Sequence, residues 1–338
     1  MTERSLAAWS TLGVGGEARA LSVMDREDAV IQALRAPGEV IVLGGGSNVL
    51  IADEGVDAHV IVLRTRGLRW GQGGSVRAAA GERWDALVEG AAARGLAGVE
   101  CLAGIPGSVG AAPVQNIGAY GQEVAEVLRR VRVFDRDSGE ARWWDREELA
   151  PSYRHTALKG DPRRVVLEVE LGLTAGPPAP LRHGELRDRV GVERPTHAQV
   201  RAAVLGARGA RGMLPDSGVR SAGSFFTNPV VPADRAAALK DRFGGLPCWP
   251  EGEGRVKLAA GWLIERAGFP RGTTRGLAGL SPLHALALVN LGGARAADLL
   301  ALAREVQRGV LRSMGVWLRP EPVLLGFAED PLAAPPAG

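Results

Sequence analysis

The sequence predicts an α+β protein with more than one domain, and three observations support this prediction. Its 338 residues exceed the usual size of one domain, so we expect two or three compact units. Hydrophobic residues make up 46% of the chain and charged residues 23%, which is the balance of a globular protein. Short β-branched runs alternate with helical patterns at both ends of the chain, whereas its middle contains mostly strand patterns.

The first stretch is predicted to form a small α/β unit. Residues 25–35 begin with a capping aspartate and early acids and end with arginine, which indicates a helix. The β-branched runs at 39–43 and 59–63 are predicted strands. The glycine-rich turn at 44–48 lies between them.

The middle stretch is predicted to contain strands with few helices. Residues 128–135 and 140–145 flank a turn and read as a hairpin, and 163–173 is a further strand. The proline-rich piece 176–180 is a loop because proline interrupts both helices and strands. A helix capped by Thr196 follows and extends to about residue 208.

The last stretch is predicted to alternate helices and strands. We expect a helix that opens at 232–235, a buried helix at 257–267 and a long helix at 296–314. We expect strands at 285–290 and 316–326. Small residues and prolines dominate 331–338, which we expect to be a disordered tail.

Composition excludes several classes of function. The formal net charge is +3, and no basic run carries interleaved aromatic residues, so we expect no nucleic-acid partner. No apolar stretch is long enough to span a membrane, and the first ten residues do not resemble a secretory signal, so we expect a cytoplasmic protein. Cys101 and Cys248 lack a metal-ligand spacing, which predicts reduced structural thiols and no metal site.

The glycine-rich turn at 44–48 is a candidate anion site. It follows a strand and leads into an apolar run, so its backbone amides are able to point at a phosphate. It lacks the Lys-Ser/Thr ending of a nucleoside-triphosphatase loop, and it also lacks the third glycine and the following helix of a dinucleotide fingerprint. By spacing alone, a plain tight turn explains it equally well.

A second glycine-rich segment occupies 104–121, with Ser108, Gln115, Asn116 and Tyr120 interspersed. Such a run allows backbone to approach a ligand closely, and the alternative is a long surface loop. Together, the two loops suggest a dinucleotide cofactor bound outside a Rossmann frame.

A third segment, 221–229, places Ser224 between small residues and two phenylalanines. No Gly-x-Ser-x-Gly elbow surrounds Ser224, and no histidine spacing supplies it with a base, which argues against a hydrolase nucleophile. Taken alone, this serine is predicted to be structural.

Six motifs in order resemble the UDP-N-acetylenolpyruvoylglucosamine reductase family. The resemblance begins at 9–13 and ends at 317–321, so it covers almost the whole chain. The motifs are Leu-Gly-Gly-Gly-Ser-Asn-Val-Leu at 43–50, Gly-Ile-Pro-Gly-Ser-Val-Gly at 104–110, Gln-Asn-Ile-Gly-Ala-Tyr-Gly at 115–121, Ser-Tyr-Arg at 152–154, Ala-Gly-Ser-Phe-Phe-Thr-Asn-Pro at 222–229 and Lys-Leu-Ala-Ala-Gly-Trp-Leu-Ile at 257–264.

The resemblance implies an FAD-binding fold of the vanillyl-alcohol-oxidase (PCMH) type, with two subdomains and a smaller α/β substrate-binding domain. We expect FAD-binding subdomains at 1–66 and 67–210 and the substrate-binding domain at 211–315. The strand at 316–328 is expected to return to the FAD-binding part.

The implied activity is the NADPH-dependent reduction of a UDP-amino-sugar enolpyruvyl ether through FAD, in bacterial cell-wall precursor synthesis. The flavin carries the redox chemistry, while the protein orients it and manages charge. We expect a monomer that binds the UDP-amino sugar and NADPH. By the same resemblance, the cofactor-binding residues are Gly44, Gly45, Gly46, Ser47, Asn48, Gly104, Ile105, Pro106, Gly107, Ser108, Gly110 and Ala111.

The resemblance also implies the roles of three catalytic residues. Hydride addition leaves negative charge on the carbon that bears the substrate carboxylate, and a cation and a positioned acid both lower this barrier. Ser224 is the implied proton donor, Arg154 the cation and Glu321 the carboxylic acid that holds or polarises the enolate. Implied substrate contacts are Tyr120, Asn228, His183 and His284, the last where some relatives carry glutamine.

The departures from the family pattern fall in the substrate half. His183 stands where some relatives have a tyrosine that closes over the UDP part, and Thr227 replaces a common lysine. Met213 stands where relatives carry a lysine for the pyrophosphate, so Arg211 or Arg220 is a candidate for that role, unless the cation lies elsewhere.

Two alternative functions remain at this point. One is a flavin-dependent oxidase of the same fold, which would use O2 and often attaches FAD through histidine or cysteine; 44–48 contains neither. The other is a non-catalytic flavin-binding module, which would need none of Ser224, Arg154 and Glu321.

Overall fold

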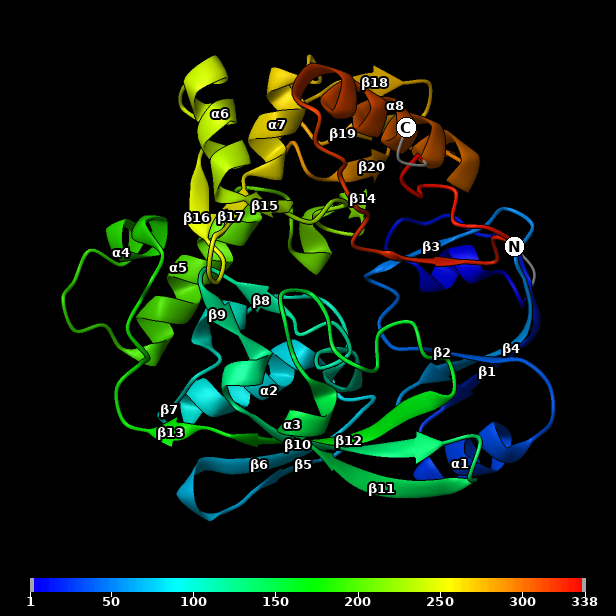
Figure 1. Cartoon of the computed structure of the whole chain (residues 1–338). Helices are drawn as coiled ribbons and strands as arrows, with labels where there is room; N and C mark the ends of the chain where they lie inside the picture. The colour runs from blue at the N-terminus through cyan, green and yellow to red at the C-terminus, as the bar shows by residue number, and fades with distance from the viewer. Residues whose placement is uncertain (1–2, 336–338) are drawn as a thin grey trace. The chain divides into compact units, whose positions relative to one another are not determined.

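The structure is a computed structural model that describes residues 3–335, and these residues form two compact units (Figure 1). Unit 1 comprises the described parts of 1–17, 47–56 and 218–338, and unit 2 comprises 18–46 and 57–217. Both units contain helices and sheets, as the α+β prediction requires. The predicted boundaries of the three functional subdomains remain a prediction.

The first sheet of unit 2 confirms the predicted α/β arrangement. Its strand order is β1 (Ala18–Met24), β4 (Val56–Leu63), β2 (Val40–Leu43), and β2 runs parallel to β4. Helix α1 (Glu27–Arg35) connects β1 to β2 and buries Val30 and Leu34. The chain therefore leaves the end of β2 directly into the glycine-rich turn.

The second sheet of unit 2 is antiparallel, with five strands. Their order is β11 (Glu140–Asp145), β10 (Leu128–Asp135), β12 (Arg164–Gly172), β6 (Ser75–Ala79) and β5 (Leu68–Trp70), and Figure 1 shows β10, β11 and β12 side by side. The pairing of Arg130 with Asp145 and of Asp135 with Glu140 confirms the predicted hairpin. Alternate residues such as Val131 and Val133 are buried, which fixes the register because a slip of one residue would expose them.

Helices and short segments complete unit 2. The helices are α2 (Trp84–Ala93), α3 (Arg146–Leu149), α4 (Gly184–Val190) and α5 (His197–Gly209). Thr196 accepts a hydrogen bond from the Gln199 backbone, which confirms the predicted cap of α5. The short strands are β7 (Leu96–Ala97), β8 (Gly118–Ala119), β9 (Gln122–Glu123) and β13 (Thr174–Ala175), and the 3₁₀ helices are η2 (Gln72–Gly74), η3 (Glu100–Leu102), η4 (Val109–Ala111) and η5 (Val124–Glu126).

Unit 1 contains three sheets and three α-helices. The first sheet has the strand order β14 (Arg220–Ser221), β20 (Leu288–Asn290), β19 (Ala278–Leu280), β18 (Thr274–Arg275). The second has the order β15 (Val230–Pro232), β17 (Arg255–Leu258), β16 (Cys248–Pro250). The third is the parallel pair of β21 (Val323–Leu325) with β3 (Val49–Ile51). The helices are α6 (Ala233–Phe243), α7 (Ala260–Arg266) and α8 (Ala296–Met314), with the 3₁₀ helix η1 (Leu6–Trp9). A further 3₁₀ helix, η6 (Pro215–Ser217), ends unit 2.

Three predicted elements of unit 1 are wrong in extent. The predicted helix at 257–267 begins only at Ala260, because 255–258 pairs as β17 with strands on both sides. The predicted strand at 285–290 shortens to β20, since Ala287 donates its backbone N–H to the His284 carbonyl in a turn. The closing strand at 316–326 shortens to β21, because prolines at 320 and 322 lack the N–H that a ladder requires.

The beginning of the predicted disordered tail is packed. Leu332 is only 1% exposed, and its carbonyl accepts a hydrogen bond of 3.1 Å from Gln307 on α8. Arg304 donates to the Pro331 carbonyl at 2.8 Å. The prediction of disorder is therefore wrong for these two residues, and 336–338 lie outside the described residues.

Among the described residues, no helix has both the length and the apolar character needed to cross a membrane.

Candidate functional site

The two glycine-rich loops predicted to bind the cofactor pack against each other in unit 2. A Cβ atom on Gly45 would lie 2.7 Å from the Gly107 Cα atom, and one on Gly44 would collide with Ser108 Oγ. Only glycine allows this approach of backbone to backbone. Gly45 is exposed and Gly107 is half-buried, so a ligand is able to reach the place where the loops meet.

Several contacts that the sequence did not reveal fix these loops. Arg64 donates to the Gly44 carbonyl at 2.9 Å. Asp85 on α2 accepts a hydrogen bond from the Gly104 amide at 2.7 Å, and Arg208 on α5 donates to the Gly104 carbonyl at 3.1 Å. Arg208 is 6% exposed, and burial lowers the pKa of its guanidinium. The second loop is thus held from two helices, which keeps it preorganised.

The remaining part of the glycine-rich turn, Ser47 and Asn48, lies in unit 1. Asn48 donates through Nδ2 to the Glu321 carbonyl at 3.3 Å, and the Val323 amide donates to the Asn48 carbonyl at 3.0 Å. These contacts bring a predicted cofactor residue and a predicted catalytic residue together, through the parallel pairing of β21 with β3.

Ser224 lies on an irregular segment that pairs with the chain around Glu321. The Glu321 amide donates to the Phe225 carbonyl at 2.8 Å, and the Phe225 amide donates to the Leu286 carbonyl at 2.7 Å. Phe225 and Phe226 are buried and hold the segment in the core of unit 1. Ser224 itself remains half-buried.

The Ser224 hydroxyl has a histidine partner. Ser224 Oγ and His284 Nε2 form a hydrogen bond of 3.2 Å. Asn228, four residues after the serine, accepts a hydrogen bond through Oδ1 from the Ala260 amide at 2.9 Å, at the first turn of α7. Unit 1 therefore gathers Ser224, His284 and Glu321 around one segment, and Asn228 supports a helix start.

Arg154 is fixed in unit 2 by the 115–121 motif. Its φ of 55° is in the left-handed region, an unusual conformation for arginine that requires support from its surroundings. Its Nη2 donates to the Gly118 carbonyl at 2.6 Å, and Nη1 lies 3.7 Å from Glu123. The guanidinium carbon also lies 5.0 Å from the centre of the Tyr153 ring. These contacts give the cation one orientation.

Tyr120 lies in a cluster that joins α4 and α5 of unit 2. Its hydroxyl accepts a hydrogen bond of 3.3 Å from Arg211, and its ring meets the His183 ring edge to face at 5.2 Å. Arg211 also donates to Glu185 at 2.5 Å. Burial raises the pKa of Tyr120, which outweighs the opposing effect of Arg211 and Arg208, so the phenol stays protonated and able to donate.

The positions that depart from the family pattern have distinct surroundings. The Met213 amide donates to the Arg208 carbonyl at 3.0 Å. Arg220 lies on β14 opposite Asn290, whereas Arg211 lies within the Tyr120 cluster. Thr227 donates from its backbone to the Arg319 carbonyl at 3.0 Å. Of the two candidate phosphate cations, Arg211 contacts a predicted substrate residue, Tyr120.

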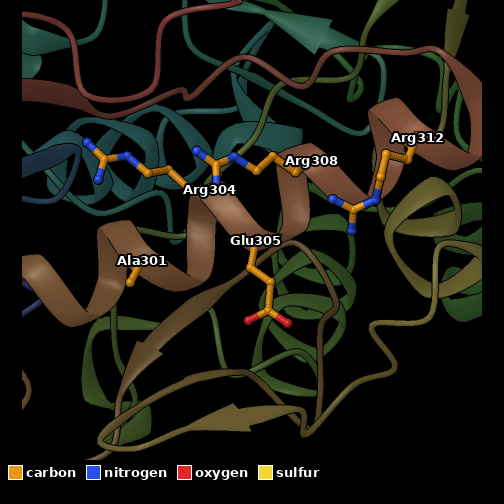
Figure 2. A pocket seen from close by; sticks show the side chains of 5 residues that line it. All are labelled: Ala301, Arg304, Glu305, Arg308 and Arg312. Carbon is orange, nitrogen blue, oxygen red and sulfur yellow. The ribbon is translucent and has the colours of Figure 1, made fainter.

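A cavity of about 380 Å³ runs along one face of α8 (Figure 2). Its lining residues are Ala301, Arg304, Glu305, Arg308 and Arg312. No predicted site residue lines it, and Glu305 is engaged by Arg275 at 2.7 Å. This cavity is therefore separate from the predicted catalytic residues of unit 1.

Comparisons with protein families match two parts of the chain. Residues 19–144 match the family described as "FAD binding domain", and residues 215–325 match the family described as "UDP-N-acetylenolpyruvoylglucosamine reductase, C-terminal domain". These matches confirm the predicted combination of an FAD-binding fold with a further domain.

Whole-chain relatives and a solved structure agree with these matches. The UDP-N-acetylenolpyruvoylglucosamine reductase of Nocardia farcinica is 50% identical, over 95% of this chain and 88% of the relative. That of Saccharopolyspora erythraea is 46% identical, over 96% and 95%. The crystal structure of UDP-N-acetylenolpyruvylglucosamine reductase from Thermus caldophilus has a TM-score of 0.68 at 30% identity, over 95% of this chain and 97% of that one.

Proposed function

Because the chain belongs to the UDP-N-acetylenolpyruvoylglucosamine reductase family, we propose that Ser224, Arg154 and Glu321 carry its reaction. The protein is an FAD-containing oxidoreductase that uses NADPH to reduce UDP-N-acetylglucosamine enolpyruvate to UDP-N-acetylmuramate. This reaction is a step of peptidoglycan precursor synthesis. The pairing of the Ser224 segment with Glu321, at 2.8 Å between the Glu321 amide and the Phe225 carbonyl, is the observation that supports the assignment best.

The glycine loops fit a flavin dinucleotide. Gly45 faces Gly107 backbone to backbone, and Gly44 faces the Ser108 side chain; the backbone amides of such glycine-rich loops bind the phosphates of nucleotides. We assign the FAD contacts to 44–48 and to 104–111, as the motifs predict. When bound, FAD transfers a hydride from NADPH to the substrate.

The protein's own part is to manage the charge that hydride addition creates. Negative charge develops on the substrate carbon beside the carboxylate. Each fixed group that is directed at this charge lowers the activation barrier by about 3 kcal/mol. Arg154, oriented by Gly118 and Glu123, supplies a cation for the carboxylate. Glu321 holds or polarises the enolate, and Ser224 Oγ delivers the proton to the carbon.

We assign substrate contacts to Tyr120, His183, Asn228 and His284. The Tyr120 phenol is protonated and half-buried beside the His183 ring, which suits a contact with a phosphate or sugar oxygen. Arg211 is the best candidate for the pyrophosphate cation, because it contacts Tyr120 directly. Its ion pair with Glu185 would have to be shared with the phosphate or broken by it.

The wider biological assignments follow from the reaction. The nucleotide-sugar substrate favours a cytoplasmic location, and we propose that the chain acts as a monomer that supports cell shape and cell division through wall synthesis. The proposed subdomains are 1–66 and 67–210 for FAD, with 316–328, and 211–315 for substrate.

The Ser224→Ala variant tests the assignment of the proton donor. The purified enzyme is reduced anaerobically with NADPH, and the substrate is then added while the flavin absorbance is followed. We expect reduction by NADPH to be unchanged and reoxidation by the substrate to slow on the order of 100-fold or more. Ser313→Ala is the matched control, because the Ser313 hydroxyl donates to the Gly309 carbonyl within α8 and is not among the proposed site residues.

Equal loss of both half-reactions in Ser224→Ala would contradict the assignment. Wild-type flavin that is reoxidised by O2 but not by the substrate would favour the oxidase alternative. Flavin that NADPH does not reduce at all would favour the non-catalytic module.

A further inference from the structure

The hydrogen bond between Ser224 and His284 addresses a chemical difficulty in the proposed function. A serine hydroxyl is a weak acid, so donating its proton leaves an alkoxide that requires stabilisation. Ser224 Oγ and His284 Nε2 lie 3.2 Å apart, within the range for a proton to pass between them. His284 is also the only histidine in the sequence segments that make up unit 1.

The loop that carries His284 is held in a defined shape. The Ser281 amide donates to the Ala287 carbonyl at 2.8 Å, and the Ala287 amide donates to the His284 carbonyl at 3.0 Å. The Leu286 carbonyl accepts from the Phe225 amide, next to Ser224 itself. The loop and the serine segment are thus joined at two points, one between side chains and one between backbones.

The charges near this pair lie on the elements that pack against it. The loop 281–287 and the segment 221–229 contain no charged residue apart from His284 when it is protonated. The charged residues on the elements that pack against them include Arg220 on β14, Arg255 and Lys257 on β17, Glu265 and Arg266 on α7, Arg271 in the turn that follows, and Arg319 and Glu321 before β21. Of these, Glu265 and Glu321 have the sign that favours a protonated imidazole, and the Glu321 backbone binds the same segment as the serine.

We propose that His284 is a proton-relay residue that acts through Ser224. This proposal rests on the proposed role of Ser224 as the proton donor. The imidazolium donates its Nε2 proton to Ser224 Oγ while Oγ transfers its own proton to the substrate carbon. This proton and the hydride that bound flavin would supply saturate the double bond, the serine ends neutral, and His284 ends as a neutral imidazole. Solvent then reprotonates His284, so protons and electrons balance over the turnover.

This relay predicts a pH dependence with a definite sign. Below the pKa of His284 the imidazole is charged and the relay is ready, and above it the relay is lost. Reoxidation of reduced flavin by substrate should therefore slow as the pH rises through the histidine range, whose ordinary centre is about 6.5. A residue that only holds the serine in place would not produce this inflection.

His284→Gln is the informative variant, because an amide is able to bond to the serine but does not titrate. We expect substrate reoxidation at pH 6 to slow on the order of tenfold, and its inflection with pH to disappear. His59→Gln is the matched control, since His59 Nε2 also bonds to a serine, Ser22 Oγ, at 2.9 Å within the first sheet of unit 2.

A second measurement does not depend on turnover. In the oxidised holoenzyme labelled on its five histidines, the imidazole signals are followed by NMR, and the His284 signal is the one that His284→Gln removes. We expect Ser224→Ala to shift that signal and Ser313→Ala to leave it unchanged. An unshifted signal in Ser224→Ala, or an inflection that persists in His284→Gln, would overturn the relay.

The two proposals fail in different ways. If Ser224→Ala is reoxidised by substrate at the wild-type rate, then the serine is not the donor and the proposed function loses its central residue. If Ser224→Ala is impaired but His284→Gln matches the wild type at every pH, then the serine assignment stands and the relay alone is wrong.

Discussion

At the scale of single residues, the two cysteines have different environments. Cys101 is buried, and burial raises the pKa of its thiol to about 12, with a further contribution from Glu100 and Glu126. Cys248 is only half-buried. Because the thiolate is the reactive form, a thiol with a pKa near 12 is almost entirely unreactive at pH 8.

We therefore predict that a thiol reagent modifies one cysteine of the native enzyme at pH 8. With a reagent that releases one chromophore for each thiol it modifies, the absorbance should correspond to one thiol per chain in the native protein and to two in denaturant. The Cys248→Ser variant should release almost nothing until it is unfolded. Rapid modification of Cys101 in the folded Cys248→Ser variant would show that its surroundings open to solvent.

The roles of individual residues were predictable only where a motif carried them. Ser224 and Glu321 were found through the family motifs, since neither has a local pattern that identifies it. The bond from Ser224 to His284 joins residues far apart in sequence, so no spacing rule reveals it. Asp85 and Arg208, which fix the second glycine loop, were missed for the same reason.

At the scale of elements, the packing of the two glycine loops makes a steric prediction. A Cβ at position 45 would lie 2.7 Å from the Gly107 Cα atom, and backbone on both sides leaves little room to relax. A clash of this kind costs about 1–3 kcal/mol, so Gly45→Ala should weaken FAD binding on the order of tenfold or more. Fluorescence titration of the apoprotein with FAD measures the change.

Gly206→Ala in α5 is the control for Gly45→Ala. A Cβ at that position meets only the end of the Arg189 side chain at 3.9 Å, and alanine favours the helix by up to about 1 kcal/mol. The control should therefore bind FAD normally and unfold at a slightly higher temperature. Normal FAD affinity in Gly45→Ala would mean that the loops separate easily or do not hold the cofactor.

Elements with strong local signals were predicted well, and those fixed by partners were not. The ends of α8 and of the β10–β11 hairpin match the prediction because hydrophobic period and turn residues define them. Residues 257 and 258 were predicted as the start of a helix, but they belong to β17, which pairs with β15 and β16. The buried position of Leu332 likewise depends on α8, which a local pattern cannot show.

At the scale of the whole molecule, each unit is assembled from separate stretches of the sequence. Strand β21 pairs with β3, which precedes it by more than half of the chain. Such long-range pairings have no local signal, so composition and periodicity alone could not predict the units. The order of the family motifs along the whole chain provided that information, because relatives with the same order share the fold.

Flavin removal should reveal how binding at the glycine loops stabilises the fold. A ligand that binds only the native state at 100 times its Kd stabilises that state by about 2.7 kcal/mol, so the apoprotein should unfold at a lower temperature than the holoenzyme.

Because 44–46 and 104–111 contact each other and are the proposed FAD contacts, amide exchange should accelerate most in these segments. Residues 84–93 and 197–209 support the second loop and should respond less. Amide exchange that accelerates uniformly across both units, or that does not accelerate in the loops, would place the flavin elsewhere. If the loops hold FAD, adding FAD back should restore the slow exchange.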